Sequence, residues 1–394
     1  MSIEIIHQLG HSDCWNYASH NEDGVGAGFI QSPLHITYNQ IQGLNSQILQ
    51  KSYFDPQFFK PDDCSEKILS YSFYPRNYGD VFLPDNFISN YSEQCALECF
   101  RFQHNLNFNK IIIPTIHFSG LPLELPEKLN NLFVKPFLRQ SNSYTPHNPI
   151  LLQLIVNSQM IINHEYSAQL LNWITGIRGI DGVYLIADVS PRNKQIKNID
   201  FLYYYLLFID SLRQNDLYVL LGYQNTESIL LSLANPNAIT IGTYENRRIF
   251  DISKFDKSTA PTPRQPNPRI YLSQMLQWVE INYIGAMQRS LGDLSFIDES
   301  KYTDKVKEFQ PSHNWHFSQP VLYKHYLTVF SKQMNAISSL PQKERFELIM
   351  DIFYKALRLN LKMSSIKFNE NSDVSHIDKW ITAANQFAEV KGWK

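Results

Sequence analysis

The sequence predicts an α/β protein of the (β/α)8 TIM-type barrel class, with an insertion after the second strand and a helical C-terminal extension. Three observations predict it. Short β-branched strands recur along residues 24–292, helical stretches separate them, and most strands end in polar or charged residues. Residues 220–248 are the clearest example, because they predict a buried strand, a short helix and a second buried strand.

Three parts follow from this pattern: an irregular N-terminal segment (residues 1–23), the barrel (24–292) and a helical region (293–394). Eight strands are expected, at residues 25–30, 52–57, 110–117, 149–156, 182–188, 217–221, 238–241 and 269–272. The insertion covers residues 60–108. Helices are expected near residues 92–104, 199–214, 277–292, 319–337, 342–362 and 374–390.

An open doubly wound sheet is the structural alternative. Such a sheet usually carries a glycine-rich phosphate-binding turn after its first strand. Here Gly24, Gly26 and Gly28 lie before or inside the strand and not in the turn that follows it. The glycine positions therefore favour the barrel.

Composition is that of a soluble globular protein. The 394 residues carry a net charge of -2, which excludes a general basic field for non-specific nucleic-acid binding. The N-terminus lacks a signal-peptide pattern, and no apolar run approaches the roughly 18 residues of a membrane span. We therefore expect a cytoplasmic protein with reduced thiols, no membrane contact and no cofactor.

Two groups of residues have spacings that resemble metal sites. His7, His11 and Cys14 would share one helical face, but the glycine and polar residues between them favour a loop. Cys95 and Cys99 lie four apart on a predicted helix without a second close pair, which is typical of core cysteines. We expect no metal site.

Barrel enzymes carry their chemistry at the C-terminal ends of the strands, where the loops converge. Residues at those ends are therefore the candidates. The catalytic candidates are Asp188 and Asp55 as nucleophile or general base, His117 as a proton shuttle, and Glu245. The ligand-binding candidates are Ser32, Gln57, Asn157, Gln224, Arg247 and Arg248, of which the arginines suit a phosphate or carboxylate.

Structural roles are the alternative for each candidate. Asp55 and Asp188 precede proline-containing turns, in which a carboxylate accepts backbone N–H bonds. A histidine such as His117 after an apolar strand is often a hydrogen-bonded core residue. Glu245 and the two arginines that follow it could pair with one another.

The order of motifs also carries a family resemblance. One stretch runs from Leu221-Gly222 through a helix start at Thr226-Glu227, a short leucine-rich helix and a strand to Asn246-Arg247-Arg248 and Phe250. This order of elements resembles the late barrel strands of tRNA-guanine transglycosylases and their DNA-modifying relatives. Residues 29–61 have a similar early layout. The resemblance covers roughly half of the chain, is mostly architectural, and implies a (β/α)8 barrel that exchanges a base by attack of an aspartate on the anomeric carbon of a sugar.

Two family features are missing. Where the family carries its nucleophilic aspartate, this chain has Gly242, Thr243 and Tyr244, with Glu245 the nearest carboxylate. The family's zinc ligands, three cysteines and a histidine, are absent, because all four cysteines precede residue 100. A repurposed barrel is therefore as consistent with the sequence as a working transglycosylase.

Two functional hypotheses follow. In the first, the strand ends bind a nucleotide, a nucleobase or a sugar phosphate, with N-glycosidic chemistry by Asp188, Asp55 or Glu245. In the second, the barrel is a non-catalytic subunit whose helical C-terminal region docks a protein partner, in a bacterial complex that acts on nucleic acid or in antiviral defence.

Overall fold

The computed structural model describes residues 2–11, 13–62, 64–79, 81–144, 148–189, 194–256, 267–308 and 319–394. Its centre is a sheet of eight parallel strands, β1 (Glu4–Gln8), β2 (Gly28–Gln31), β3 (Ser52–Phe54), β4 (Ile111–Ile113), β5 (Ile150–Asn157), β6 (Gly182–Asp188), β7 (Tyr218–Gly222) and β8 (Ala238–Gly242). In the order β3-β2-β1-β8-β7-β6-β5-β4, consecutive strands are paired except β3 and β4, which are the two ends of the sheet, and β8 pairs with β1.

The sheet is a nearly closed barrel. Between β3 and β4, where the ladder is interrupted, the backbone N–H of Asn109 donates to the carbonyl oxygen of Ser52 at 2.8 Å. The predicted α/β class and barrel topology are therefore confirmed.

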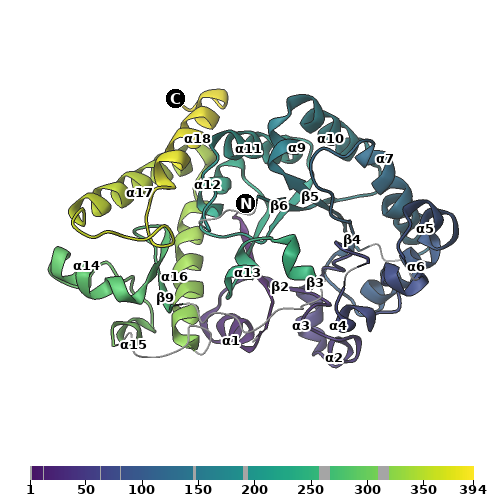
Figure 1. The fold of residues 1–394 in the computed structure, drawn as a ribbon, viewed down its shortest axis with the longest axis horizontal. Coiled ribbons are helices and arrows are strands. Elements are labelled where there is room, and N and C mark those ends of the chain that lie inside the picture. The colour runs from purple at the N-terminus through teal and green to yellow at the C-terminus, as the bar shows by residue number, and fades with distance from the viewer. Residues whose placement is uncertain are drawn as a thin grey trace.

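Helices surround the strands (Figure 1). They are α1 (Cys14–Asp23), α2 (Tyr38–Gln42), α3 (Ser46–Gln50), α4 (Glu66–Leu69), α5 (Pro84–Asn90), α6 (Ser92–Asn105), α7 (Leu125–Leu129), α8 (Lys135–Ser141), α9 (Ser158–Ile162), α10 (His164–Gly176), α11 (Ile199–Gln214), α12 (Ser228–Leu231), α13 (Glu245–Arg248), α14 (Ile284–Leu291), α15 (Thr303–Lys307), α16 (Pro320–Ser338), α17 (Gln342–Lys362) and α18 (Ile377–Val390). The insertion that contains α4–α6 forms one end of the molecule, and α14–α18 form the other.

Two strand predictions were wrong. The N-terminal segment, expected to be irregular, supplies β1, in which His7 is buried and bonded to the carbonyl oxygen of Val25 (2.9 Å) and to Asn16 (3.0 Å). Residues 269–272, expected as the eighth barrel strand, form β9 (Arg269–Leu272), which pairs antiparallel with β10 (Gln277–Glu280) outside the barrel. The count of eight was right because the two errors cancel.

Side chains fill the barrel in layers, because alternate residues of each strand point inward. At the N-terminal end, the Tyr218 hydroxyl donates to Glu4 (3.1 Å), and the Lys110 ammonium lies 4.7 Å from the Tyr218 ring centroid. An apolar layer follows, built from Ile6, Ile30, Ile112, Leu151, Leu220 and Ala238. The next layer, towards the C-terminal ends, is polar.

The C-terminal helices cover the barrel beside β7 and β8, where α12 and α13 are only four residues long. α16 packs on α1, and α18 on α11. Buried Arg345 of α17 donates to the carbonyl oxygens of Ser232 (2.6 Å), Ser338 (3.2 Å) and Leu340 (3.1 Å). One arginine thus joins the segment after α12 to the turn between α16 and α17.

Replacing Arg345 with Met should lower the free energy of unfolding by about 2–3 kcal/mol, because two buried carbonyl groups and one partly buried carbonyl group lose a charged donor. Urea denaturation would measure the change. The exposed Arg289→Met variant is the control, and equal midpoints for the two variants would show that Arg345 does not hold these segments together.

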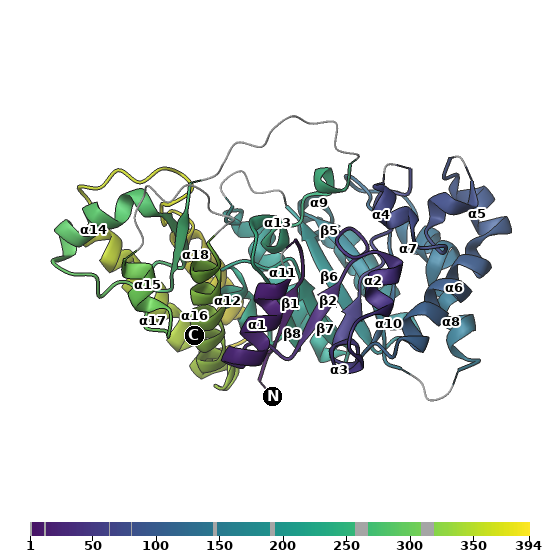
Figure 2. The same ribbon diagram turned by 90° about the horizontal axis from the view of Figure 1, so that it is seen from below.

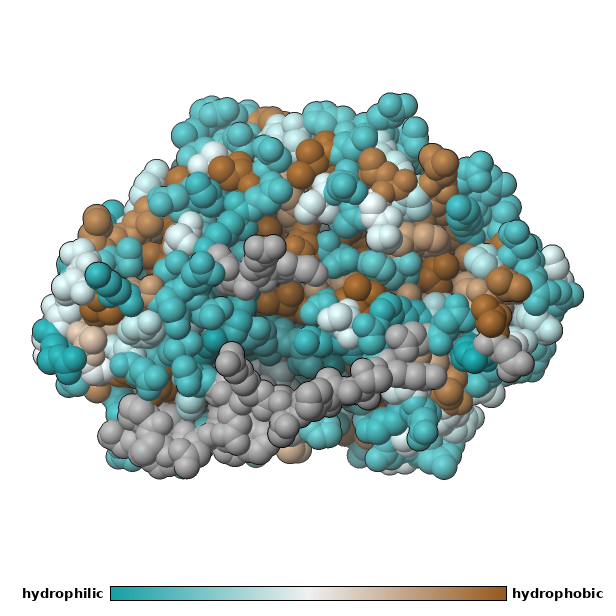
Figure 3. All heavy atoms as spheres, in the orientation of Figure 1, coloured by the Kyte–Doolittle hydropathy of each residue, from teal (hydrophilic) through white to brown (hydrophobic). Residues whose placement is uncertain are grey.

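Exposed apolar side chains are scattered among hydrophilic ones on the face drawn in Figure 3. Within the described ranges, no helix has the length and apolar character that a membrane crossing requires.

Candidate functional site

The C-terminal ends of the barrel strands carry the polar layer, on the side where Figure 2 shows α4, α9 and α13. Asp55 lies at its centre. It follows β3 directly, two residues after Tyr53, so it points into the barrel as Tyr53 does. The Asp55 side chain is fully buried.

Three donors from different parts of the barrel reach the Asp55 carboxyl group. Gln153 of β5 donates to Oδ1 at 2.7 Å, and the backbone N–H of Gln57 donates to the same oxygen at 3.1 Å. The Tyr184 hydroxyl of β6 lies 3.4 Å from Oδ2 and 3.3 Å from Oε1 of Gln8, at the end of β1. We call Asp55, Gln8, Gln57, Gln153 and Tyr184 the interior cluster.

Burial raises the pKa of Asp55 to about 7, because a charged carboxylate loses its hydration inside the barrel. Hydrogen bonds from Gln153, Gln57 and Tyr184, and the positive charge of Arg247, oppose this shift and do not cancel it. Near neutral pH, Asp55 therefore exists in both protonation states, which suits a general acid or base.

Two buried polar atoms of the interior cluster have no partner within the described part of the chain: the donor Nε2 of Gln8 and the acceptor Oε1 of Gln57. Gln57 and Tyr223 both adopt left-handed backbone conformations (φ 54° each), and Gln57 Nε2 donates to the Tyr223 hydroxyl at 3.1 Å. Left-handed non-glycine residues cost free energy and cluster at ligand sites. The strain here lies beside the two unpartnered atoms.

Arg247 lies beside this cluster and is almost fully buried. Its Nη2 donates to Nε2 of His35, and its guanidinium contacts the Tyr223 hydroxyl. Burial, followed by repulsion from Arg247, holds the pKa of His35 well below its usual value, so His35 is neutral and accepts this bond. Arg247 fits here because Gly10 and Gly242 lack side chains: a Cβ at Gly242 would lie 2.3 Å from the Arg247 Cβ.

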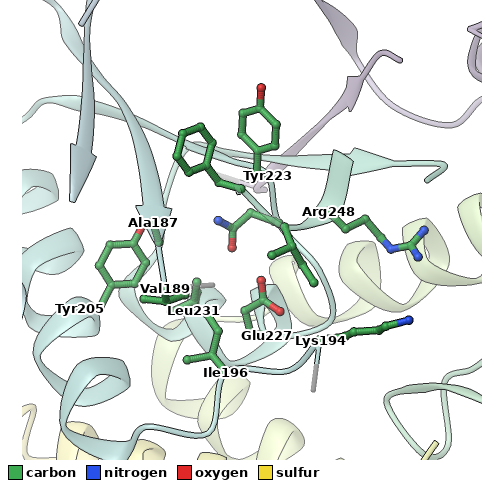
Figure 4. A pocket seen from close by; sticks show the side chains of 12 residues that line it. Ala187, Val189, Lys194, Ile196, Tyr205, Tyr223, Glu227, Leu231 and Arg248 are labelled. Atoms are coloured by element: carbon green, nitrogen blue, oxygen red, sulfur yellow. The ribbon is translucent and has the colours of Figure 1, made fainter. Parts of the chain in front are cut away.

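A second buried carboxyl group, Glu227, lies in a small cavity beside Tyr223 (Figure 4). The cavity has a free volume of about 10 Å³, enough for about one water molecule. Burial raises the pKa of Glu227 to about 7, although the backbone N–H of Asn225 donates to it at 2.8 Å. Gln224 also lines this cavity, and its acceptor Oε1 has no hydrogen-bond partner among the residues that the structure describes.

An aromatic cap closes the barrel above the interior cluster. It consists of Phe59, Phe250 and Phe255, whose ring centroids lie 4.9–5.8 Å apart. Phe250 also contacts the ring of Tyr223 at 5.4 Å. An ion pair between Lys60 and Asp256 joins the two segments that carry the cap. A ligand can reach Asp55 from this side only if the cap moves.

Two predicted catalytic residues meet at the rim. Nε2 of His117 lies 2.7 Å from Oδ2 of Asp188, and both side chains are mostly buried. The His117 ring is 6.3 Å from Phe250. Phe250 thus contacts both His117 and Tyr223, and Tyr223 is hydrogen-bonded to Gln57 of the interior cluster.

Two of the remaining candidates, Asn157 and Gln224, have structural contacts. Asn157 caps α9 through the Met160 N–H (3.0 Å), and Gln224 Nε2 donates to the carbonyl oxygen of Gly222 (2.8 Å). Ser32 is buried after β2, with its Oγ unpartnered among the described residues.

Glu245 and Arg248 lie away from Asp55. Glu245 pairs with Lys194 (2.6 Å) and Arg269 (3.4 Å), and its side chain is 44% exposed. The Arg248 guanidinium lies 4.0 Å from the ring centroid of Trp278 and points away from the Glu227 cavity in Figure 4. The structure therefore brings together Asp55, Gln57 and Arg247, and separately His117 and Asp188.

His7, His11 and Cys14 do not share one helical face, because His7 is in β1 and Cys14 begins α1. Across the described ranges, no three His, Cys, Asp or Glu side chains are arranged to hold a metal ion.

Sequence reasoning missed Gln8, Gln153, Tyr184, Tyr223 and Glu227. Gln153 and Tyr184 carried a signal, since a polar or phenolic side chain at an inward position of an apolar strand must find a partner inside the barrel. Gln8 carried none, because its strand, β1, was not recognised in the sequence. Glu227 carried none, because its position also fits an ordinary helix start.

No protein-family model matches the chain, and no curated protein matches it in sequence.

Proposed function

We propose that the C-terminal face of the barrel binds a nucleobase, free or as part of a nucleoside, in the interior cluster, and that Asp55 acts in N-glycosidic chemistry on it. The observation that carries this proposal is a buried carboxyl group with a pKa of about 7 beside one unpartnered donor and one unpartnered acceptor. The edge of a base offers adjacent donors and acceptors, which matches that set.

The aromatic residues support a base rather than a sugar phosphate. Base pockets combine hydrogen bonds to the edge of the ring with stacking on aromatic side chains. Here Gln57 of the interior cluster is hydrogen-bonded to Tyr223, and the ring of Tyr223 contacts that of Phe250. The arginines expected to bind phosphate are engaged elsewhere, Arg247 with His35 and Arg248 on Trp278.

Asp55 would act as the acid that protonates the leaving base, or in its ionised form as the group that attacks the sugar. His117, held by Asp188, would supply a second proton-transfer group at the rim. These roles require the aromatic cap to open before the ligand binds.

Calorimetric titration with the four common ribonucleosides and their bases tests the proposal, with chromatography to detect released base. One base class should bind, and Asp55→Asn should weaken it by about 10-fold or more through loss of a charge-assisted hydrogen bond. The Asp351→Asn variant, altered at a side chain that is 46% exposed, is the control. Absence of binding both in the wild type and in Phe250→Leu, which loosens the cap, would contradict the proposal.

The closed cap also favours the second hypothesis, that the barrel is a non-catalytic subunit. In that case the interior cluster is a buried structural network, and the C-terminal helices dock a protein. Light scattering on the protein purified from its host would then show a mass above that of the single chain. A lone 46.0 kDa species would count against it.

A further inference from the structure

A basic groove lies in the C-terminal helical region, away from the barrel mouth. Its volume is about 430 Å³, and it opens between α17, α16 and the turn that joins β9 to β10. Lys355, Arg358 and Lys362 of α17 line it together with Gln333 and Gln274. Their spacing places the three cations on one face of the helix over about 10 Å of its axis.

The charge of this groove is local. Residues 352–369 contain Lys355, Arg358, Lys362 and Lys367 and no Asp or Glu, in a chain whose net charge is -2. Asp351 is the carboxylate that pairs with these cations, 2.6 Å from Lys355 and 3.8 Å from Arg358. A second carboxylate, Asp298, is partly buried and accepts a hydrogen bond from the backbone N–H of Ser273, which lines the groove, at 2.8 Å. One exposed carboxylate cannot neutralise three cations, and exposed ion pairs contribute little free energy.

Stabilisation of the C-terminal end of α17 does not explain the row of cations formed by Lys355, Arg358 and Lys362. Cations interact with the helix dipole mainly in the last turn. That accounts for Lys362, the last residue of α17, but not for Lys355, two turns earlier. Lys355 and Arg358 are 66% and 62% exposed, so their charges are available to a ligand.

Apolar and aromatic groups accompany the cations. Ile352 and Leu359 also line the groove, and on the same helix Tyr354 is 44% exposed and Leu361 is 70% exposed. A row of cations beside an exposed aromatic ring is the combination that binds single-stranded nucleic acids, because the cations contact phosphates and the ring stacks on a base.

We infer that the groove formed by Lys355, Arg358, Lys362 and Gln333 binds the phosphate backbone of a single-stranded nucleic acid, with Tyr354 as a stacking platform. This is a second site, and the inference does not depend on the function proposed for the barrel.

The test is fluorescence anisotropy of a labelled single strand of about 20 nucleotides with the full chain at several salt concentrations. The K355Q/R358Q/K362Q variant should bind at least about 10-fold more weakly, with a salt slope smaller by about 2. Tyr354→Ala should weaken binding at an unchanged salt slope. The control, K128Q/K135Q/K379Q, removes three exposed lysines that do not line the groove and should bind as the wild type does.

Several outcomes would overturn the inference. One is equal binding by the groove variant and the control, with equal urea midpoints showing that both are folded. Another is tighter binding of a poly-glutamate peptide than of the strand, which would indicate an acidic protein partner. Loss of binding in Asp55→Asn but not in the groove variant would place the strand at the barrel mouth. Groove-dependent binding that persists in Asp55→Asn supports the inference even if no nucleoside binds the barrel.

Discussion

Asparagine in place of Asp55 is expected to make the protein progressively more stable than the wild type as the pH rises from about 4 to about 7, by up to about 1.4 kcal/mol per pH unit. Asp55 has a pKa of about 7 in the folded protein and an ordinary value of 3.8. Between these values, the folded state holds a proton that the unfolded state releases, so the wild type loses stability as pH rises. An amide does not titrate, and its oxygen can still accept from Gln153 and Gln57.

The full difference in free energy of unfolding between Asp55→Asn and the wild type, about 4 kcal/mol, should be reached above pH 7. The free energy of unfolding must be measured for both proteins at each pH and the wild-type value subtracted, because buried histidines make the stability of both proteins rise with pH. Burial lowers the pKa of His7 and His325 to about 4 and that of His376 to about 3, so these residues destabilise the fold as the pH falls below about 6.5. Urea denaturation at several pH values gives the curve. A constant difference would show that Asp55 is ionised throughout.

Alanine in place of Gly242 is expected to lower the free energy of unfolding by about 3 kcal/mol or more. The new Cβ would lie 2.3 Å from the Arg247 Cβ and 2.8 Å from the Arg247 backbone carbonyl group, so β8 and α13 would have to separate. Because Arg247 contacts His35 and Tyr223, the interior cluster should be disturbed as well.

Gly176→Ala is the matched control for this substitution, since a Cβ there would have no neighbour within 4 Å. Chemical denaturation should show a large loss for the Gly242 variant and almost none for the control. Similar midpoints would mean that the contact between β8 and α13 is not tight.

Long periodic helices could be predicted closely, with α16 expected at residues 319–337 and α18 at 374–390, within three residues of their observed bounds. The predicted and observed bounds of α11 and α17 are the same, because each carries a long apolar stripe at helical spacing. β1 was missed because it has five residues and includes a histidine, and a short strand gives too few positions to establish a period. Its partner β8 is far away in sequence.

The candidate site was predictable only in part. Asp55 and Gln57 were found because they follow a strand directly. Gln153 lies 98 positions from Asp55, and Tyr184 lies 129 positions from it, so their meeting depends on strand register that a single sequence does not specify. The direction of the Arg248 side chain depends on Trp278, in an element that was predicted to be helical.

The central claim is that the interior cluster is a ligand site with Asp55 at its centre. Carbon-13 NMR of the aspartate side-chain carboxyl groups, with Asp55 assigned by its loss in Asp55→Asn, tests it most directly. The Asp55 signal should titrate with a midpoint near pH 7, and that midpoint should move when one of the four nucleosides is added. A midpoint that none of the nucleosides moves, in the wild type and in Phe250→Leu alike, would contradict the claim.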